Sequence, residues 1–351
     1  MKINQTPYRT SRNYGINNIE VDESLFDKKL LPFANFAVEN AQKSEIDGNM
    51  KVKTDASIDK KLSEQLEKSA NKKVKLMIDK DTDKPILVTY TFDGKHQNLA
   101  DVLNIVVAKN VKAQVIVNYQ SSVKAYHNCQ IKSEVEENGK LDVCVSSNLE
   151  NESSSFVLFE NILSERAQIN HTIIDFGCKN SIQNFHAKLL GDEAKCDLKA
   201  MYLGKNDDVI DLNYLQDVYG KNCEATINVV GTLDEIAIKN FKGTINFVKG
   251  CKKSFGAEDE FCMLLSKDAK SKALPMLLCG EEDVDGRHSS SVGKADAKEL
   301  FYVMSRGLSQ NEALKLIVKA KLNVIVDSIF DEEFKTKMLK EIDGKLNNEK
   351  N

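Results

Sequence analysis

The stretch CDLKAMY at residues 196–202 and the stretch CEATINV at residues 223–229 decide the fold class. In both, apolar residues alternate with other residues, which is the period of a half-buried β-strand. The same alternation recurs between residues 85 and 285, so this region is predicted to be all β. Further alternating sets are Ile86, Val88, Tyr90 and Phe92; Val111, Ala113, Val115, Val117 and Tyr119; Leu141, Val143 and Val145; and Phe185, Ala187 and Leu189.

These predicted strands are short, and Gly, Asn or Asp often separates them. No long helical pattern lies between them, which argues against a doubly wound α/β fold. About 200 residues of short strands are too many for one small sandwich. Either a sandwich-like pair of domains or a β-solenoid fits, and a solenoid buries alternate side chains by stacking successive coils. No sharp fixed-period motif is visible, so pattern alone does not choose between them.

Helical patterns flank the β region. Residues 1–84 are polar and rich in Lys and Asn, and residues 57–73 (SIDKKLSEQLEKSANKK) suit a surface helix. Near the C-terminus, Asp296 and Ser309 are each followed three residues later by Glu, as in a capping box, and Asp331 is positioned to cap a third helix. The second of these helices has an apolar stripe, which needs either internal packing or a docking partner. The stripe consists of Leu314, Val318, Leu322, Ile325 and Ile329.

Composition narrows the class of protein. The 351 residues include 49 basic and 53 acidic ones, and this balance gives no reason to expect a nucleic-acid or anionic-membrane surface. There is no apolar run of about 18 residues, as a transmembrane helix requires, and no apolar segment typical of a secretory signal. We therefore expect a cytoplasmic protein without membrane or nucleic-acid partners. Its eight cysteines include no CxxC pair and are expected to be reduced thiols.

Few residues stand out as functional candidates. Cys129, Cys196 and Cys223 fall on the apolar phase of their strands and are predicted to be core residues. His288 lies in DVDGRHSSSVGK, a Gly- and Ser-rich junction between the β region and the first C-terminal helix, where functional residues often occur. Gly293–Lys294 lacks the other residues of a phosphate-binding loop. From motifs alone, an enzyme is unsupported.

The segment from Phe241 to Val318 resembles the SufB/SufD family of iron–sulfur cluster assembly scaffold proteins. The family shows an FxGxI strand, an LLLS strand, a strand with a proline, a turn similar to DDVxCxHGATVG, and a helix of the form LFYLxSRGI. A weaker likeness joins residues 9–17 (RTSRNYGIN) to the SufD N-terminal region. The short length and the H-x-x-x-V-G turn favour SufD over SufB. The matching residues are Phe241, Gly243 and Ile245; Met263 to Ser266; Pro275; Asp283, Val284, His288, Val292 and Gly293; and Leu300, Phe301, Tyr302, Ser305, Arg306 and Gly307.

The resemblance implies a fold in three parts. These are an N-terminal helical region (residues 1–84), a right-handed parallel β-helix (85–290) and a C-terminal helical domain (291–351). It also implies a non-enzymatic scaffold that pairs with a SufB-like subunit through the β-helix. A SufC-like ABC-type ATPase would bind the C-terminal helices, and a transient iron–sulfur cluster or iron would be shared with the partner. Whether a flavin participates is left open.

The resemblance also implies site residues. His288 matches the SufD histidine that is a proposed iron or cluster ligand at the subunit interface. The cysteine that usually stands two residues earlier is replaced by Gly286, and Glu260 occupies the position of the SufB cluster cysteine, with Cys262 two residues away. Glu260 and Cys262 are therefore further candidate ligands. The candidate partner-binding residues are Leu300, Tyr302, Arg306, Leu314 and Val318.

Two rival functions are weighed against the scaffold. One is a structural homodimer of the same fold without metal chemistry. The other is a β-helix carbohydrate-active enzyme, which would need an exposed acid/base cluster. The sequence shows no such cluster above chance, and it lacks Trp for stacking on sugars.

Overall fold

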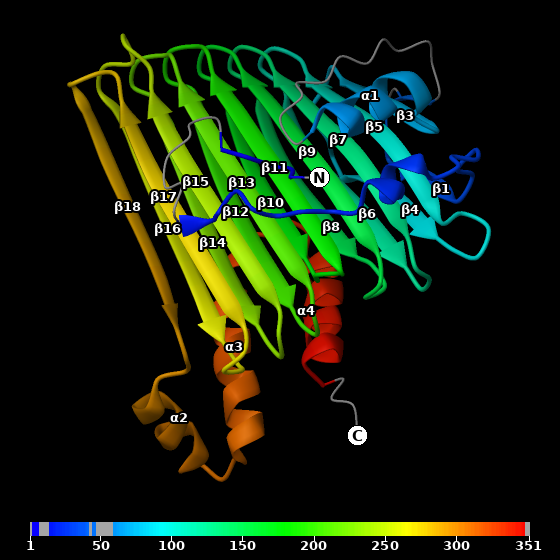
Figure 1. Cartoon of the computed structure of the whole chain (residues 1–351). Coiled ribbons are helices and arrows are strands. Elements are labelled where there is room, and N and C mark those ends of the chain that lie inside the picture. The colour runs from blue at the N-terminus through cyan, green and yellow to red at the C-terminus, as the bar shows by residue number, and fades with distance from the viewer. Residues whose placement is uncertain (1, 7–13, 42–43, 47–58, 348–351) are drawn as a thin grey trace.

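The computed structural model describes residues 2–6, 14–41, 44–46 and 59–347. Residues 9–13 of the N-terminal likeness and residues 57–58 of the predicted surface helix lie outside these ranges. The described chain forms a parallel β-solenoid of about eight turns, so the prediction of a β-helix is confirmed and the sandwich alternative is wrong. Figure 1 shows two layers of strands with β18 at one end of the stack and β1 at the other.

Each coil contributes one strand to each of two nine-stranded sheets. The first sheet contains, in spatial order, β1 (Phe36–Glu39), β4 (Ile86–Phe92), β6 (Lys112–Ser121), β8 (Lys140–Asn148), β10 (Gln168–Asp175), β12 (Lys195–Gly204), β14 (Glu224–Leu233), β16 (Ser254–Leu264) and β18 (Val284–Gly293). The second contains β2 (Ser44–Ile46), β3 (Lys72–Ile78), β5 (Asn98–Val107), β7 (Tyr126–Val135), β9 (Ser154–Leu163), β11 (Asn180–Leu189), β13 (Val209–Val218), β15 (Ile238–Phe247) and β17 (Lys270–Cys279). Among the described strands, only β1 and β2 pair antiparallel with their neighbours.

The coils repeat with a variable length. Ser154 pairs with Asn180, 26 positions on, whereas Ile238 pairs with Lys270, 32 positions on. Turns between strands are closed by residues with positive φ, often asparagine, which adopts this conformation more readily than other side chains. Asn138 has φ 56° and donates its side-chain amide to Asn110, which has φ 61° and closes the equivalent turn of the preceding coil.

The interior between the two sheets is the main core, and every second residue of strands β3 to β16 points into it. Aromatic rings stack from coil to coil. Phe185 lies 6.1 Å from Phe159 and 6.0 Å from Tyr214, centroid to centroid, and Phe241 continues the row. Cys129, Cys196 and Cys223 belong to this core, as their strand phase predicts.

The outer face of the first sheet is covered by the C-terminal helices. These are α2 (Ala297–Met304), α3 (Gln310–Val326) and α4 (Glu332–Asn347). The predicted caps at Asp296 and Ser309 are present, and Asp331 accepts a hydrogen bond from the amide of Phe334. A second buried cluster joins α3 and α4 to outward-facing residues of six successive strands, which are Ile116, Cys144, Ile174, Met201, Val230 and Met263.

The N-terminal region covers the outer face of the second sheet. It contains the 3-10 turn η2 (Glu23–Asp27) and helix α1 (Lys60–Ser69), which lies inside the predicted surface helix. Ile3, Val21 and Leu62 pack there with outward-facing residues of β7, β9 and β11, and Figure 1 shows the N-terminal segment crossing these strands. The solenoid itself begins with β3, within the part of the chain expected to be helical. No described helix is both long enough and apolar enough to cross a bilayer.

Candidate functional site at the end of the solenoid

His288 lies on the last strand of the first sheet. Strand β18 pairs with β16 along one edge, and no described strand pairs with its other edge. Residues Asp285 to Val292 of this strand are all exposed, including the imidazole of His288. In the register of the two strands His288 stands opposite Glu258, and Ser290 stands opposite Glu260. His288 therefore continues the inward-facing row of β16 to the open end of the solenoid.

Glu258 is the buried neighbour of His288. Neither of its carboxyl oxygens has a well-formed hydrogen bond with a described residue. Burial raises the pKa of Glu258 to about 8, and the charge of Glu260 adds to the effect. The carboxyl group reaches across the interior to Gly243, where any side chain would collide with it. The glycine of the FxGxI motif thus leaves the room that Glu258 occupies.

Glu260 is part of a buried ion pair. One oxygen accepts a hydrogen bond from Lys239 Nζ at 2.5 Å, and the other accepts one from Ser290 Oγ at 2.8 Å. Both charged side chains are fully buried, and Tyr202 adds a longer contact of 3.4 Å to Glu260. Because the lysine occupies one oxygen, Glu260 is anchored in the interior and reaches the exposed strand only through Ser290.

Cys262 follows Glu260 on the same face of β16. Its side chain is buried, and Val292 covers its position in the register with β18. Burial raises the pKa of the Cys262 thiol, and the positive charge of Lys239 opposes this rise. The structure therefore brings the three predicted residues, His288, Glu260 and Cys262, to one end of the solenoid.

Sequence reasoning missed Glu258, Lys239 and Ser290. Positions 258, 260 and 262 alternate along one strand, so the sequence could have indicated that they share a face. Only the pairing of β16 with β18 places Glu258 next to His288. Imidazole, carboxylate and thiolate are all competent ligands for iron. Among the described ligand-type side chains at this end (His288, Glu258, Glu260 and Cys262) only His288 is exposed, so the chain by itself offers one accessible ligand and three buried groups behind it.

The predicted partner-binding residues lie on α2 and α3. Tyr302 is 59% exposed and accepts a hydrogen bond from Arg306 at 2.9 Å, with the guanidinium stacked 5.1 Å from the ring centroid. Phe301 beside it is 74% exposed. Leu300 and Leu314 are half-buried at the margin of the second cluster, whereas Val318 is buried within it. For Val318, the structure thus selects the internal packing that the sequence left open.

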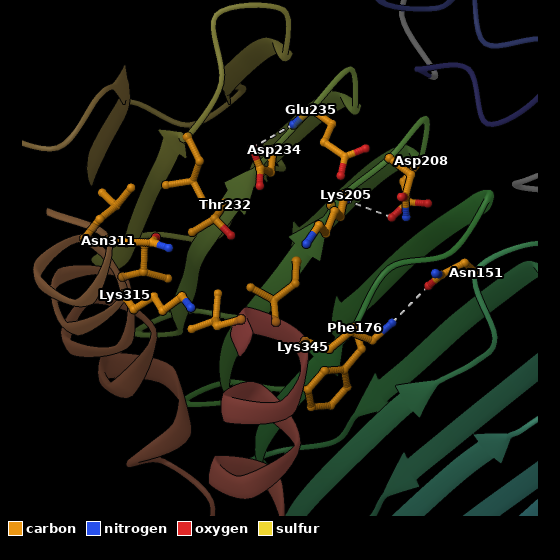
Figure 2. Close-up of a pocket in the computed structure, with 17 residues that line it drawn as sticks. Asn151, Phe176, Lys205, Asp208, Thr232, Asp234, Glu235, Asn311, Lys315 and Lys345 are labelled. Carbon is orange, nitrogen blue, oxygen red and sulfur yellow. Dashed lines mark hydrogen bonds between the residues drawn. The ribbon is translucent and has the colours of Figure 1, made fainter. Parts of the chain in front are cut away.

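A hollow of about 470 Å³ lies between α3, α4 and the ends of β12 and β14. Figure 2 shows Asn311 and Lys315 of α3 on one side and Asp208, Asp234 and Glu235 on the opposite side. Burial raises the pKa of Asp208 to about 7. Leu314 and Val318 line this hollow, but His288, Glu260 and Cys262 do not, so it is distinct from the end of the solenoid.

Comparison with known proteins finds similarity to proteins of iron–sulfur cluster assembly. The family model described as "SUF system FeS cluster assembly, SufBD core domain" matches residues 90–321. The iron–sulfur cluster assembly protein SufD of Bacillus subtilis is 28% identical over 167 residues, which are 48% of this chain and 38% of that protein. A SufBD family protein of Pyrococcus horikoshii is 27% identical over 234 residues, 65% of this chain and 51% of that protein.

SufD of Escherichia coli is 30% identical over 106 residues, 30% of this chain and 25% of that protein. The chain thus spans between a quarter and about half of the length of these three relatives. The family model, by contrast, covers well over half of the chain and includes most of the solenoid strands. The chain therefore belongs to the SufB/SufD family of iron–sulfur cluster assembly proteins, and it is SufD-like.

Proposed function

We propose that this chain is a non-enzymatic scaffold subunit of the SUF iron–sulfur cluster assembly complex. The observation that carries the proposal is the exposed imidazole of His288, held on an edge strand directly above the buried Glu258. A cluster that is cargo must leave again, so few and accessible ligands suit the task better than a complete four-cysteine cage. His288 would supply one ligand, and the partner subunit would supply the rest.

The end of the solenoid is the proposed contact with a SufB-like subunit. Strands β17 and β18 terminate the two sheets and present backbone groups that are ready to pair with another strand. A second solenoid placed there would continue both sheets and enclose His288 between the subunits. Glu260 and Cys262, which are buried here, would contribute as ligands only if the partner displaced Ser290 and Val292.

Helices α2 and α3 are the proposed contact with a SufC-like ATPase. Phe301, Tyr302 and Arg306 form an exposed aromatic and cationic face, and Leu300 and Leu314 flank it. Val318 belongs to the buried cluster that Leu300 and Leu314 border. Because α3 also packs on the first sheet, movement of the ATPase would be transmitted to the solenoid.

The test is anaerobic co-expression with SufB-like and SufC-like partners, followed by measurement of complex formation and iron content. The His288→Ala variant should assemble normally and contain much less iron. Arg287→Ala, a change at the neighbouring exposed position on the opposite face of β18, is the matched control and should keep its iron. Equal iron content in His288→Ala and wild type would overturn the ligand role.

A structural homodimer is the second candidate function, and the same unpaired edges of β17 and β18 favour it. Light scattering with and without the SufB-like chain separates the two. Formation of a heterodimer at the expense of any homodimer supports the scaffold function. A homodimer that does not bind the SufB-like chain supports the structural homodimer. We further propose a cytoplasmic location, a right-handed winding of the coils and a division into three parts, with the solenoid running from β3 to β18 between the N-terminal region and the C-terminal helices.

A further inference from the structure

A second group of ligand-type side chains lies inside the solenoid, far along the stack from His288. Asp101 of β5 stands in register with Cys129 of β7, and His127 lies two residues before Cys129 on the same inward face. All three side chains are fully buried. Their carboxylate, imidazole and thiol atoms lie within 4.8 Å of one another. Neighbouring coils thus bring three different kinds of metal ligand to one point.

The separations fit a small ion. His127 Nε2 lies 3.0 Å from Asp101 Oδ1, and Cys129 Sγ lies 3.4 Å from Asp101 Oδ2. With bonds of about 2.0–2.3 Å, tetrahedral zinc places neighbouring ligand atoms roughly 3.3–3.8 Å apart. The imidazole and the thiol thus each lie at about a ligand–ligand separation from the Asp101 carboxylate, and all three ligand atoms lie within 4.8 Å of one another.

The surrounding groups resemble the supports of a metal centre. His127 Nδ1 lies 3.1 Å from Ser155 Oγ, which would accept a hydrogen bond from Nδ1–H and leave the lone pair of Nε2 free to bind. Tyr119 of β6 donates its hydroxyl proton to Asp101 Oδ2 at 2.9 Å. Hydrogen bonds of this kind orient metal ligands and fix the histidine tautomer.

Charge balance also favours an ion here. The buried carboxylates of Glu260 and Asp211 each have a buried lysine partner, Lys239 and Lys242. The polar partners of Asp101 are instead an imidazole, a phenol and a thiol. A divalent ion with one carboxylate, one thiolate and a neutral imidazole carries no net charge. A neutral complex costs least in an apolar interior.

We propose that Asp101, His127 and Cys129 bind one divalent transition-metal ion of the zinc type inside the solenoid. Because the three side chains are enclosed by β5, β6 and β7, the ion would enter while the coils form. Its role would be to hold adjacent coils together near the start of the stack. This site is independent of the proposed cluster site at β18.

The test uses the whole chain expressed with Co²⁺ in place of zinc, because thiolate–Co²⁺ bonds give a strong near-ultraviolet absorption band. The wild-type chain should show this band with about one Co²⁺ per chain, and Cys129→Ser should lose it. Cys196→Ser, at another buried cysteine of the same core, is the matched control and should keep the band, as should His288→Ala.

If Cys129→Ser fails to fold, His127→Gln provides the second variant. It keeps the thiol and removes the imidazole. Loss of a supporting group alone lowers metal affinity about 10–100-fold, so loss of this ligand should lower the affinity for Co²⁺ at least as strongly. A wild-type chain without the thiolate band, or a band that persists in Cys129→Ser, would overturn the proposal.

Discussion

Glu258 and His288 are register partners on β16 and β18, one buried without a well-formed hydrogen bond and the other open to solvent. Adjacent strands lie about 4.8 Å apart, so the two side chains project from neighbouring positions on the same face of the sheet. Any subunit that covers β18 would enclose both groups together. The pair therefore joins the polar interior of the solenoid to its exposed end.

The Glu258→Gln variant tests whether the buried carboxyl group supports His288. The amide preserves shape but removes the ionisable carboxyl group, so the affinity of the complex for iron should fall by about tenfold or more, and its iron content with it, as for other groups that orient ligands. Asp259→Asn, on the opposite face of β16, is the control. Iron determination on the purified complex is the measurement, and an unaffected Glu258→Gln complex would remove Glu258 from the site.

Breaking the Lys239–Glu260 pair should destabilise the chain. Lys239→Met leaves a buried carboxylate without its cation, which costs about 3–5 kcal/mol. The double variant Lys239→Met/Glu260→Gln removes both charges and should recover most of that loss. Urea unfolding followed by circular dichroism measures both, and a double variant no more stable than the single one would contradict this account.

Stability should depend on His171 at acid pH. This side chain is buried against Phe159 and Phe185, and neither ring nitrogen has a hydrogen-bond partner among the described residues. Burial lowers the pKa of His171 from 6.5 to about 3. Between these values the unfolded chain binds more protons than the folded chain, so stability falls as the pH drops below 6.5, by up to about 1.4 kcal/mol per pH unit.

The His171→Leu variant should lose this contribution. The difference in unfolding free energy between wild type and variant, measured by urea unfolding at a series of pH values, cancels the effect of shared carboxylates. We expect that difference to change steadily below pH 6.5 in favour of the variant. A difference that stays constant with pH would show that His171 is not held neutral by burial.

Two substitutions test the exposed face of α2 and the buried packing of α3 separately. Phe301→Ser changes an exposed residue, so stability should stay within about 0.5 kcal/mol while capture of the SufC-like ATPase weakens. Leu322→Ala, in the buried cluster that joins α3 to the first sheet, should cost about 2–5 kcal/mol. Pull-down and thermal unfolding are the measurements. Normal capture by Phe301→Ser would place the ATPase contact elsewhere.

Removing all residues after 294 is less informative than these point changes. We would expect the β body to survive such a deletion if the helices formed a separate unit. The structure shows instead that α3 and α4 cover apolar residues such as Ile174 and Met201 on the first sheet. Their loss would expose that surface to water and favour aggregation.

Alternation of residue types was sufficient to predict the strands and the inward-facing Cys129, Cys196 and Cys223. The capping residues likewise predicted the starts of α2 and α3. The coil repeat could not be recognised in the sequence, because its length varies from coil to coil and it is defined by which backbone residues pair. Cys144 has the opposite phase, and its burial depends on the helices packed over it.

The sites were harder to predict than the strands, for the same reason. Asp101 and Cys129 are 28 positions apart in sequence and adjacent in space, and this relation exists only once β5 and β7 are paired. Glu258 likewise acquires its significance from the register of β18. A local sequence pattern cannot show that these residues are neighbours, because the length of the intervening turns determines which residues pair.

Helices α3 and α4 affect how the coils of the solenoid can open. Coils of a solenoid contact only their neighbours, so such folds tend to open unit by unit. Here α3 and α4 pack on six neighbouring strands of the first sheet, β6, β8, β10, β12, β14 and β16. Because the two helices share one buried cluster with all of these strands, the coils should open together. The final coil, with β17 and β18, lies beyond the strands that α3 and α4 cover. It is therefore the part of the stack most free to adjust its shape to a neighbouring subunit.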